Sequence, residues 1–365
     1  MIFSRRDIDL LKLLRWCQYI RWGDLCSVFS EAEIKNLMCV GYISAYKKSD
    51  VLQLSAAGRA FVHSLLGGNC PNSKQSYHQS AMQRRLRVSK IVLTAYKAGF
   101  DVFAQKPGGE IAQPALCLTS VMRINGKNPW GNARTAAIIN YGKLVCSAHY
   151  VCQGIGNVMV EDEIAGLYNQ TANLEFEKRG FIFAGESYQS VIEELNGVTE
   201  DNVFKLIGYG DMYRESILPV YLLSCDDIGA LQLRIMSVPE YRQWISRMVL
   251  SDKYKEADDE VEEWDAMYDG KPFVVAVDMD LRRIDSAIKI AEERGYNQVT
   301  VIGFKTQAET VLYPRYRDTG RARVFTFTEE AEKDLMTTLG IGEIKQKPYV
   351  TEKGDVLDAL LIRTR

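Results

Sequence analysis

The first 66 residues follow patterns that are typical of short helices in succession. Along residues 4–19 the apolar residues recur at every third position, as an amphipathic helix requires: Ile8, Leu11, Leu14 and Cys17. A second short helix is predicted over 22–29. A third begins after Ser30, because a serine is a good N-cap and Glu33, three residues later, completes a capping box.

The pattern then changes from helical spacing to alternation. Gly41 is expected to end the third helix. Two alternating segments follow, at 42–46 and 51–54, and the polar turn 47–50 separates them, which predicts a β-hairpin. A further helix is predicted over 56–66, after a serine cap.

This order of elements, with a hairpin after the third helix, is that of a winged helix-turn-helix module, predicted here for residues 1–68. Such modules place the third helix in the major groove of double-stranded DNA and the wing along the phosphate backbone or the minor groove. Amide and ammonium groups on the third helix are therefore candidates for base contacts, and lysines at the wing tip for phosphate contacts. The candidate DNA-binding residues are Arg21, Lys35, Asn36, Lys47 and Lys48.

Two features leave an alternative open for this module. Glu31 and Glu33 make the third helix less basic than that of a strong DNA reader. Winged modules also serve as protein-docking surfaces, so the alternative is a wing that binds a protein.

A second basic segment follows the module. Residues 69–76 are polar and contain a proline, which indicates a linker. The helix predicted over 80–99 contains no acidic residue, and one side of it is apolar. It could lie against a phosphate backbone; the alternatives are a solvated helix edge and a dimer contact. Its candidate DNA-binding residues are Arg84, Arg85, Arg87 and Lys90.

From residue 100 onward, short strands alternate with helices, which predicts an α/β domain with a mixed sheet over 100–250. The predicted strands cover 115–124, 135–141, 144–151, 181–184, 218–224 and 230–236. The predicted helices cover 161–179 and 188–195.

The remainder divides into an acidic run and a regular α/β pattern. Residues 252–269 hold nine acids and two bases, which indicates an exposed helix or linker, assigned to 251–271. The region 272–365 is predicted to be βαβ-like with a small parallel sheet. Its strands are expected at 273–277, 299–304 and 322–328, and its helices at 281–295 and 329–339.

Composition and charge sharpen this picture. The chain has 365 residues, 47% hydrophobic and 25% charged, as expected of a globular protein with two or three domains. No apolar run is long enough to span a bilayer and no apolar signal core opens the chain, so we expect a cytoplasmic protein without a membrane partner. The net charge of −2 hides a sharp division: residues 1–99 carry fifteen Lys and Arg against six acids, or +9, and the other 266 residues carry −11. That division favours a polyanion-binding end joined to a different body.

The sequence carries little evidence of catalysis. The eight cysteines include no CxxC pair, and the nucleotide-binding and hydrolase motifs GxxxxGK[ST], GxGxxG and GxSxG are absent. The one candidate carboxylate pair is Asp278 and Asp280, because carboxylates at a strand's carboxyl end can hold Mg²⁺. For Asp280 the alternative is a helix N-cap. We expect no cofactor, no metal and no enzymatic activity, with a DNA nuclease or nickase as the alternative.

Two segments resemble the replication-relaxation family of plasmids and conjugative elements. They are "LSAAGRAFV" at 54–62 and "YHQSAMQRRLRVSKIVLTAYKAG" at 77–99, in which His78 precedes the basic helix. The resemblance implies a winged helix joined to an α/β domain like a reduced restriction-endonuclease core. It also implies a DNA-binding regulator or an accessory factor in replication or conjugative transfer, with a relaxase or replication proteins as partners. Winged proteins often bind palindromic sites as dimers, so a homodimer is an open alternative.

Overall fold

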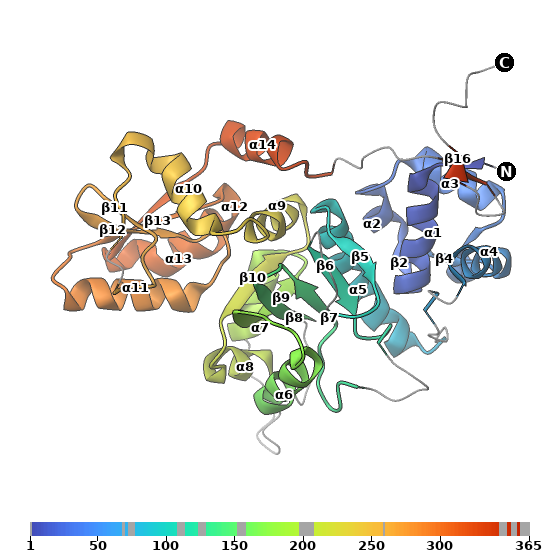
Figure 1. Ribbon diagram of the computed structural model, residues 1–365, viewed down its shortest axis with the longest axis horizontal. Coiled ribbons are helices and arrows are strands. Elements are labelled where there is room, and N and C mark those ends of the chain that lie inside the picture. The colour runs from blue at the N-terminus through green and yellow to red at the C-terminus, as the bar shows by residue number, and fades with distance from the viewer. Residues whose placement is uncertain are drawn as a thin grey trace. The chain divides into compact units, whose positions relative to one another are not determined.

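The computed structural model describes most of the chain, as two compact units (Figure 1). The first unit comprises residues 1–107, 115–128 and 342–365, and the second comprises 108–114 and 129–341. The described residues are 2–67, 70–71, 77–107, 114–122, 129–151, 158–196, 208–257, 260–342, 349–351 and 356–357. Helices and several mixed sheets make the fold an α/β fold.

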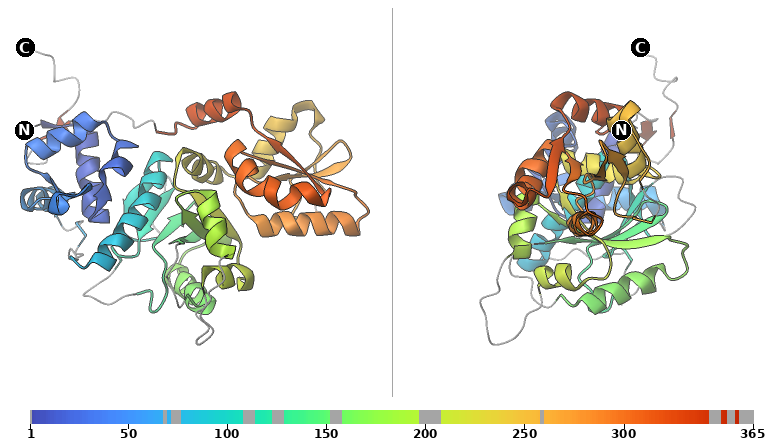
Figure 2. Two further views of the ribbon diagram at one scale, coloured as in Figure 1. Left: turned by 180° about the vertical axis from the view of Figure 1, so that it is seen from behind. Right: turned by 90° about the vertical axis from the view of Figure 1, so that its left-hand side faces the viewer.

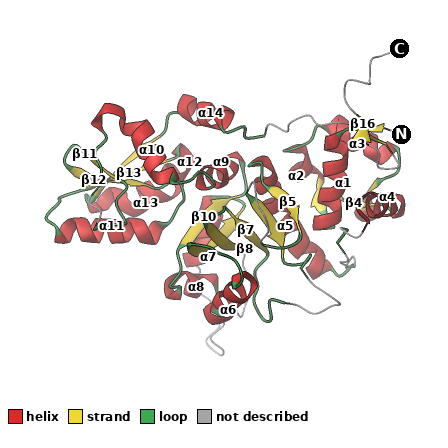
Figure 3. Ribbon diagram, viewed as in Figure 1, coloured by secondary structure: helices red, strands yellow, loops and turns green. Residues whose placement is uncertain are grey.

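The first unit begins with the helices and hairpin that the sequence predicts (Figure 3). Its elements, in order, are α1 (Arg5–Cys17), β2 (Ile20–Arg21), α2 (Trp22–Cys26), α3 (Glu31–Cys39), β3 (Ile43–Ala45), β4 (Val51–Leu54) and α4 (Ala56–Leu66). The caps predicted at Ser30 and before residue 56 are present: the Ser30 hydroxyl accepts from Glu33 N, and that of Ser55 accepts from Gly58 N. Strand β2, which the sequence did not predict, pairs with β4 to make a three-stranded sheet of order β2-β4-β3.

The hairpin and α4 are held together by a close backbone approach. Gly58 lies in the first turn of α4, where a Cβ would be 2.2 Å from the carbonyl oxygen of Tyr42. Only glycine fits at this distance. Phe61 also packs its ring against Tyr42, with centroids 5.2 Å apart.

The first unit continues with the basic helix and two strands. The helix predicted over 80–99 is α5 (Gln79–Lys97), and His78 occupies its N-cap position. Of the strand predicted over 115–124, residues 115–118 form β6 (Ala115–Leu118), which is parallel to β5 (Asp101–Ala104), residues 119–122 are not in a strand, and residues 123–124 lie outside the described residues. Near the chain ends, β1 (Ile2–Phe3) pairs with β15 (Tyr349–Thr351), and β15 pairs with β16 (Val356–Leu357). Most of the linker predicted at 69–76 lies outside the described residues.

The second unit contains two sheets. The strands of its first sheet run in the order β7-β8-β9-β10, with β7 antiparallel to β8 and the other pairs parallel. These strands are β7 (Ala137–Asn140), β8 (Leu144–Tyr150), β9 (Lys178–Gly185) and β10 (Val220–Ser224). The accompanying helices are α6 (Val160–Thr171), α7 (Tyr188–Asn196) and α8 (Tyr209–Glu215). The helix predicted over 161–179 is therefore too long, because β9 already begins at Lys178.

The strand predicted over 230–236 is wrong, because this segment belongs to helix α9 (Asp227–Met236). The helix is buried on nearly all sides, so its apolar residues show no clear helical period. The Asp226 side chain caps it by accepting from Gly229 N at 2.8 Å. A Cβ at Gly229 would lie 1.7 Å from the Ser224 carbonyl oxygen, so this glycine lets α9 start directly after β10.

The second sheet has the order β11-β12-β13-β14, and β12, β13 and β14 are parallel as predicted. The strands are β11 (Ala266–Tyr268), β12 (Lys271–Val275), β13 (Val299–Gly303) and β14 (Ala322–Thr326). In Figures 1 and 2, α10 and α11 lie on opposite sides of these strands. The helices of this part are α10 (Tyr241–Leu250), α11 (Leu281–Glu293), α12 (Lys305–Gln307), α13 (Tyr313–Tyr316) and α14 (Glu329–Thr338).

The acidic run at 252–269 is not simply an exposed helix or linker, because its end forms β11, which pairs with β12. Within it, Asp265 is buried and lies 3.0 Å from Arg283 of α11. A charge run therefore contributes a buried ion pair that its composition does not reveal.

Among the helices that the structure describes, none combines the length and the apolar character that crossing a bilayer requires.

Candidate nucleic-acid interface

The tip of the β3-β4 hairpin presents two consecutive lysines in a left-handed turn. Ser49 N donates to Tyr46 O at 2.9 Å, which closes a four-residue turn around Lys47 and Lys48. Both lysines have positive φ, 46° and 59°, as in a type I′ turn, and both are exposed. Asparagine and glycine are usual at these positions because a Cβ destabilises the left-handed region. The hairpin tip therefore holds two lysines in an unfavourable backbone conformation.

Helix α3 exposes the two residues that the sequence assigns to base contacts. Lys35 and Asn36 both lie on its exposed face. Lys35 Nζ lies 2.6 Å from Glu31, and the hydrogen bond to that carboxylate raises the pKa of Lys35. Glu33 forms an ion pair with Arg6 of α1. Each of the two acids that make this helix less basic is therefore paired with a cation.

Arg21 connects the hairpin sheet to the second helix. It is the last residue of β2 and occupies the N-cap position of α2. Its guanidinium lies 4.0 Å from Asp50 in the hairpin loop, and both side chains are well exposed, 47% and 63%. A surface pair of this kind is weak enough to be exchanged for a phosphate contact.

Helix α5 packs against the hairpin with its apolar side. Leu86 belongs to a buried cluster with Tyr19 and Val51, and Met82 and Tyr46 pack against the same cluster. The basic helix and the root of the wing are therefore neighbours within the first unit.

The four basic candidates of α5 have different environments. Arg84 is exposed, whereas Arg85 and Arg87 are half-buried. Lys90 is mostly buried and lies 3.5 Å from Asp24 of α2, so its ammonium group takes part in packing α2 against α5. Arg84 is therefore the most exposed residue of the four.

The two candidate carboxylates, Asp278 and Asp280, both take part in structural hydrogen bonds. Asp278 is fully buried, and it accepts hydrogen bonds from Tyr241 Oη at 2.5 Å and Arg242 Nε at 2.8 Å. Burial alone would raise the pKa of Asp278, but attraction from Arg242 and Arg283 and these hydrogen bonds outweigh it and lower that pKa. Asp278 is therefore ionised and fully engaged inside the protein.

Asp280 is the N-cap of α11, as the alternative interpretation has it. Its side chain accepts from Arg283 N at 3.2 Å. Burial and the neighbouring Asp278 charge raise the pKa of Asp280. Among the described residues, no group of three or more His, Cys, Asp or Glu side chains is arranged to hold a metal ion.

A buried polar cluster that the sequence did not predict joins α6 to the first sheet of the second unit. Glu163 of α6 accepts from the backbone N and the hydroxyl of Thr135, at 3.2 and 2.7 Å, and His149 Nε2 lies 3.8 Å from it. Glu163 thus holds the segment leading into β7. Nothing in the local sequence pattern signals this pairing, because the three residues are far apart in the chain.

The strands β7 and β8 themselves carry no carboxylate side chain.

Comparison of the whole chain with protein-family models, with curated proteins and with solved structures found no matching family, protein or structure.

Proposed function

We propose that residues 1–68 form a winged helix-turn-helix module that binds double-stranded DNA, mainly through phosphate contacts. The observation that carries this proposal is the wing tip, where Lys47 and Lys48 are exposed and held at positive φ. Residues kept in an unfavourable conformation at a functional site are a recognised sign that their side chains are needed there.

Two further features support the same assignment. The three-stranded sheet and the exposed face of α3 are the parts that a winged module presents to DNA. Helix α5 packs on the root of the hairpin and adds Arg84 to the cationic groups of this unit. Since Glu31 and Glu33 remain on α3, we expect modest base specificity.

We infer the biological role from the resemblance to the replication-relaxation family. The position of His78, directly before α5, agrees with the motif that carries this resemblance. The proposed role is a DNA-binding regulator or an accessory factor in replication or conjugative transfer of a mobile element. A relaxase or replication proteins are the expected partners.

The nuclease alternative receives no support from the candidate carboxylates. Asp278 is buried in an ion pair with Arg242, and Asp280 caps a helix. We therefore propose binding without cleavage.

The test is the salt dependence of duplex binding by the full chain, measured by fluorescence anisotropy with a mixed-sequence duplex. Each lysine that engages a phosphate contributes about one to the slope of log K against log salt. The double variant Lys47→Gln/Lys48→Gln is expected to bind more weakly and to reduce the slope by about two.

A matched control changes the same number of charges elsewhere. Lys143→Gln/Lys289→Gln removes two exposed lysines of the second unit and is expected to leave the slope unchanged. Equal slopes for the wild type and the wing variant would contradict the proposal.

A further inference from the structure

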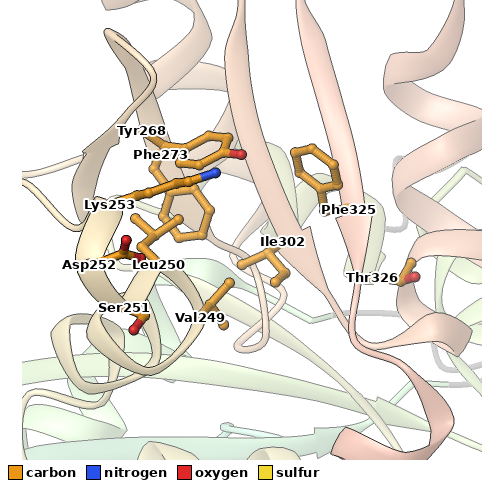
Figure 4. Close-up of a pocket in the computed structure, with 10 residues that line it drawn as sticks. All are labelled: Val249, Leu250, Ser251, Asp252, Lys253, Tyr268, Phe273, Ile302, Phe325 and Thr326. Carbon is orange, nitrogen blue, oxygen red and sulfur yellow. The ribbon is translucent and has the colours of Figure 1, made fainter.

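The cavity beside the β11-β14 sheet of the second unit, shown in Figure 4, measures about 370 Å³. Two of its rings, Tyr268 and Phe325, meet edge to face with centroids 6.5 Å apart, and Phe273 belongs to the buried core. The rings that line this cavity therefore pack against one another and leave no slot between them for a planar ligand. A charged contact between α1 and α3 in the first unit bears more directly on function.

One arginine of α1 makes three contacts at the start of α3. Arg6 Nη2 donates to Val28 O at 2.8 Å and to Glu33 Oε2 at 3.1 Å. Arg6 Nε donates to Glu33 Oε1, so the guanidinium and the carboxylate share two hydrogen bonds. The guanidinium carbon also lies 5.0 Å from the ring centroid of Phe29. A single side chain therefore contacts both the segment that leads into α3 and the first turn of α3.

Glu33, the ion-pair partner of Arg6, also caps α3. Its Oε2 accepts from Ser30 N at 2.8 Å and from Ser30 Oγ at 2.9 Å, which belongs to the capping box of this helix. The carboxylate that binds Arg6 is thus fixed to the backbone at the start of α3. Paired hydrogen bonds between an arginine and a carboxylate fix direction as well as distance. Arg6 consequently sets where α3 begins and how the helix is turned relative to α1.

This orientation determines which side chains α3 presents. Glu33 and Asn36 are three positions apart, and residues at that spacing are neighbours on a helix surface. A rotation of α3 after loss of the Arg6 contacts would move Lys35 and Asn36 with the helix. Hydrogen bonds to base edges weaken steeply when their angles change. A lysine on a flexible stem can still reach a phosphate after such a movement.

The contact between Arg6 and Glu33 is more protected than the other ion pair of α3. The two side chains are 26% and 24% exposed, whereas those of Lys35 and Glu31 are 61% and 62% exposed. Partly buried pairs are screened less by salt than exposed ones. Burial raises the pKa of Glu33, but hydrogen bonds from Arg6 and Ser30 outweigh this effect and lower that pKa. Glu33 is therefore ionised at neutral pH, and its pair with Arg6 is intact.

We infer that Arg6 is a positioning residue of the DNA-binding surface, which holds α3 in the orientation that lets Lys35 and Asn36 reach base edges. It acts through its contacts with Val28 and Glu33 and not by contacting the duplex. This inference rests on the proposed function. It assigns base discrimination to a contact between α1 and α3, while the wing supplies most of the phosphate contacts.

The test measures two duplexes against the full chain by fluorescence anisotropy. One duplex is enriched from a random-sequence pool by the wild-type protein, and the other has a mixed sequence; the ratio of the two affinities is the base discrimination. Arg6→Lys keeps the positive charge but loses the paired hydrogen bonds. It is expected to lower the ratio about fivefold, the lower end of what one good base contact contributes, and to leave the salt slope unchanged. Partial unfolding would lower both affinities alike and would not change the ratio.

Two further variants complete the design. Arg5→Lys makes the same change one position earlier, where the arginine pairs with Asp9 of its own helix, and is expected to leave the ratio unchanged. Glu33→Gln keeps the capping box, since glutamine also serves at that position, but removes the ion pair. It is expected to lower the ratio as Arg6→Lys does. Circular dichroism checks folding, and Glu33→Gln alone carries the test if Arg6→Lys does not fold.

Three results would overturn the inference. The first is a ratio that changes no more in Arg6→Lys than in Arg5→Lys, and the second is a wild-type protein that prefers no sequence. The third is a ratio that falls in Arg6→Lys but not in Glu33→Gln, since Arg6 would then contact DNA itself. Failure of the proposed function gives a different result, because Lys47→Gln/Lys48→Gln would then leave the salt slope of the wild type unchanged.

Discussion

At the tip of the hairpin, two neighbouring lysines adopt a backbone conformation that their side chains disfavour. For an L-residue other than glycine, the left-handed region costs about 1–2 kcal/mol. Lys47 and Lys48 both occupy it, and the turn is closed by a normal hydrogen bond from Ser49 N to Tyr46 O. The turn therefore would be more stable with other residues, and its two lysines are better explained by their charge than by the stability of the fold.

Replacing the tip by asparagine and glycine separates stability from binding. The variant Lys47→Asn/Lys48→Gly is expected to raise the free energy of unfolding by about 1 kcal/mol, because both residues suit a type I′ turn. Duplex affinity is expected to fall, because two phosphate contacts are lost. Urea unfolding and fluorescence anisotropy measure the two quantities.

Lys47→Gln/Lys48→Gln is the matched control for this change. It loses the same two charges but keeps both Cβ atoms in the left-handed region, so weaker binding without added stability is expected. A gain in stability with unchanged duplex affinity in the asparagine-glycine variant would show that the lysines do not contact DNA.

At the scale of elements, local signals predicted the helices and hairpin of residues 5–66 well and the rest of the chain less well. Caps such as Ser30 and turn residues act within a few positions, so they mark α3 and the hairpin directly. Helix α9 is buried on nearly all sides and therefore lacks the amphipathic pattern that distinguishes helix from strand. The two-residue strand β2 is too short to show any period.

Tertiary contacts also decide how an element responds to mutation. An alanine in a helix is usually more stable than glycine by about 1 kcal/mol. Gly58→Ala is expected to reverse that sign, because its Cβ would be 2.2 Å from Tyr42 O and would push α4 away from the hairpin. We expect a loss of a few kcal/mol, on the scale of overpacking, measured by thermal or urea unfolding.

Gly23→Ala provides the comparison within the same unit. Gly23 lies in α2, and a Cβ there would meet nothing within 4 Å. This variant is expected to be slightly more stable than the wild type. If both alanine variants shift stability in the same direction, the close approach of α4 to the hairpin is not as described.

At the scale of the whole molecule, contacts between distant residues account for what the sequence could not reveal. Gln307 donates to Tyr188 Oη at 3.0 Å and to Val277 O at 2.9 Å, across 119 and 30 positions of the chain. Gln232 donates to Leu222 O and Asp278 O.

The sequence marks Asp278 as a carboxylate after a strand, but its partners Tyr241 and Arg242 lie on α10, a helix that the pattern did not predict. Without that helix, a structural ion pair and a metal site look alike.

The buried pair of Asp278 and Arg242 therefore makes a prediction about stability in the second unit. Asp278→Asn keeps the shape of the side chain but leaves the guanidinium of Arg242 without its counter-charge, and breaking a buried pair in this way costs about 3–5 kcal/mol. Asp278 follows β12 and bonds to Arg242 of α10 and to Gln232 of α9, and Gln232 also donates to Leu222 O of β10. These bonds connect the two sheets of the second unit, so amide protection is expected to fall in both sheets. Residues 5–66 belong to the first unit and are expected to keep their protection. Hydrogen exchange measured by mass spectrometry resolves these regions. Glu177→Gln is the control, since its pair with Lys143 is exposed and worth less than about 1 kcal/mol. Equal effects of the two variants would mean that Asp278 contributes no more than a surface charge, and the question of a chemical role for it would reopen.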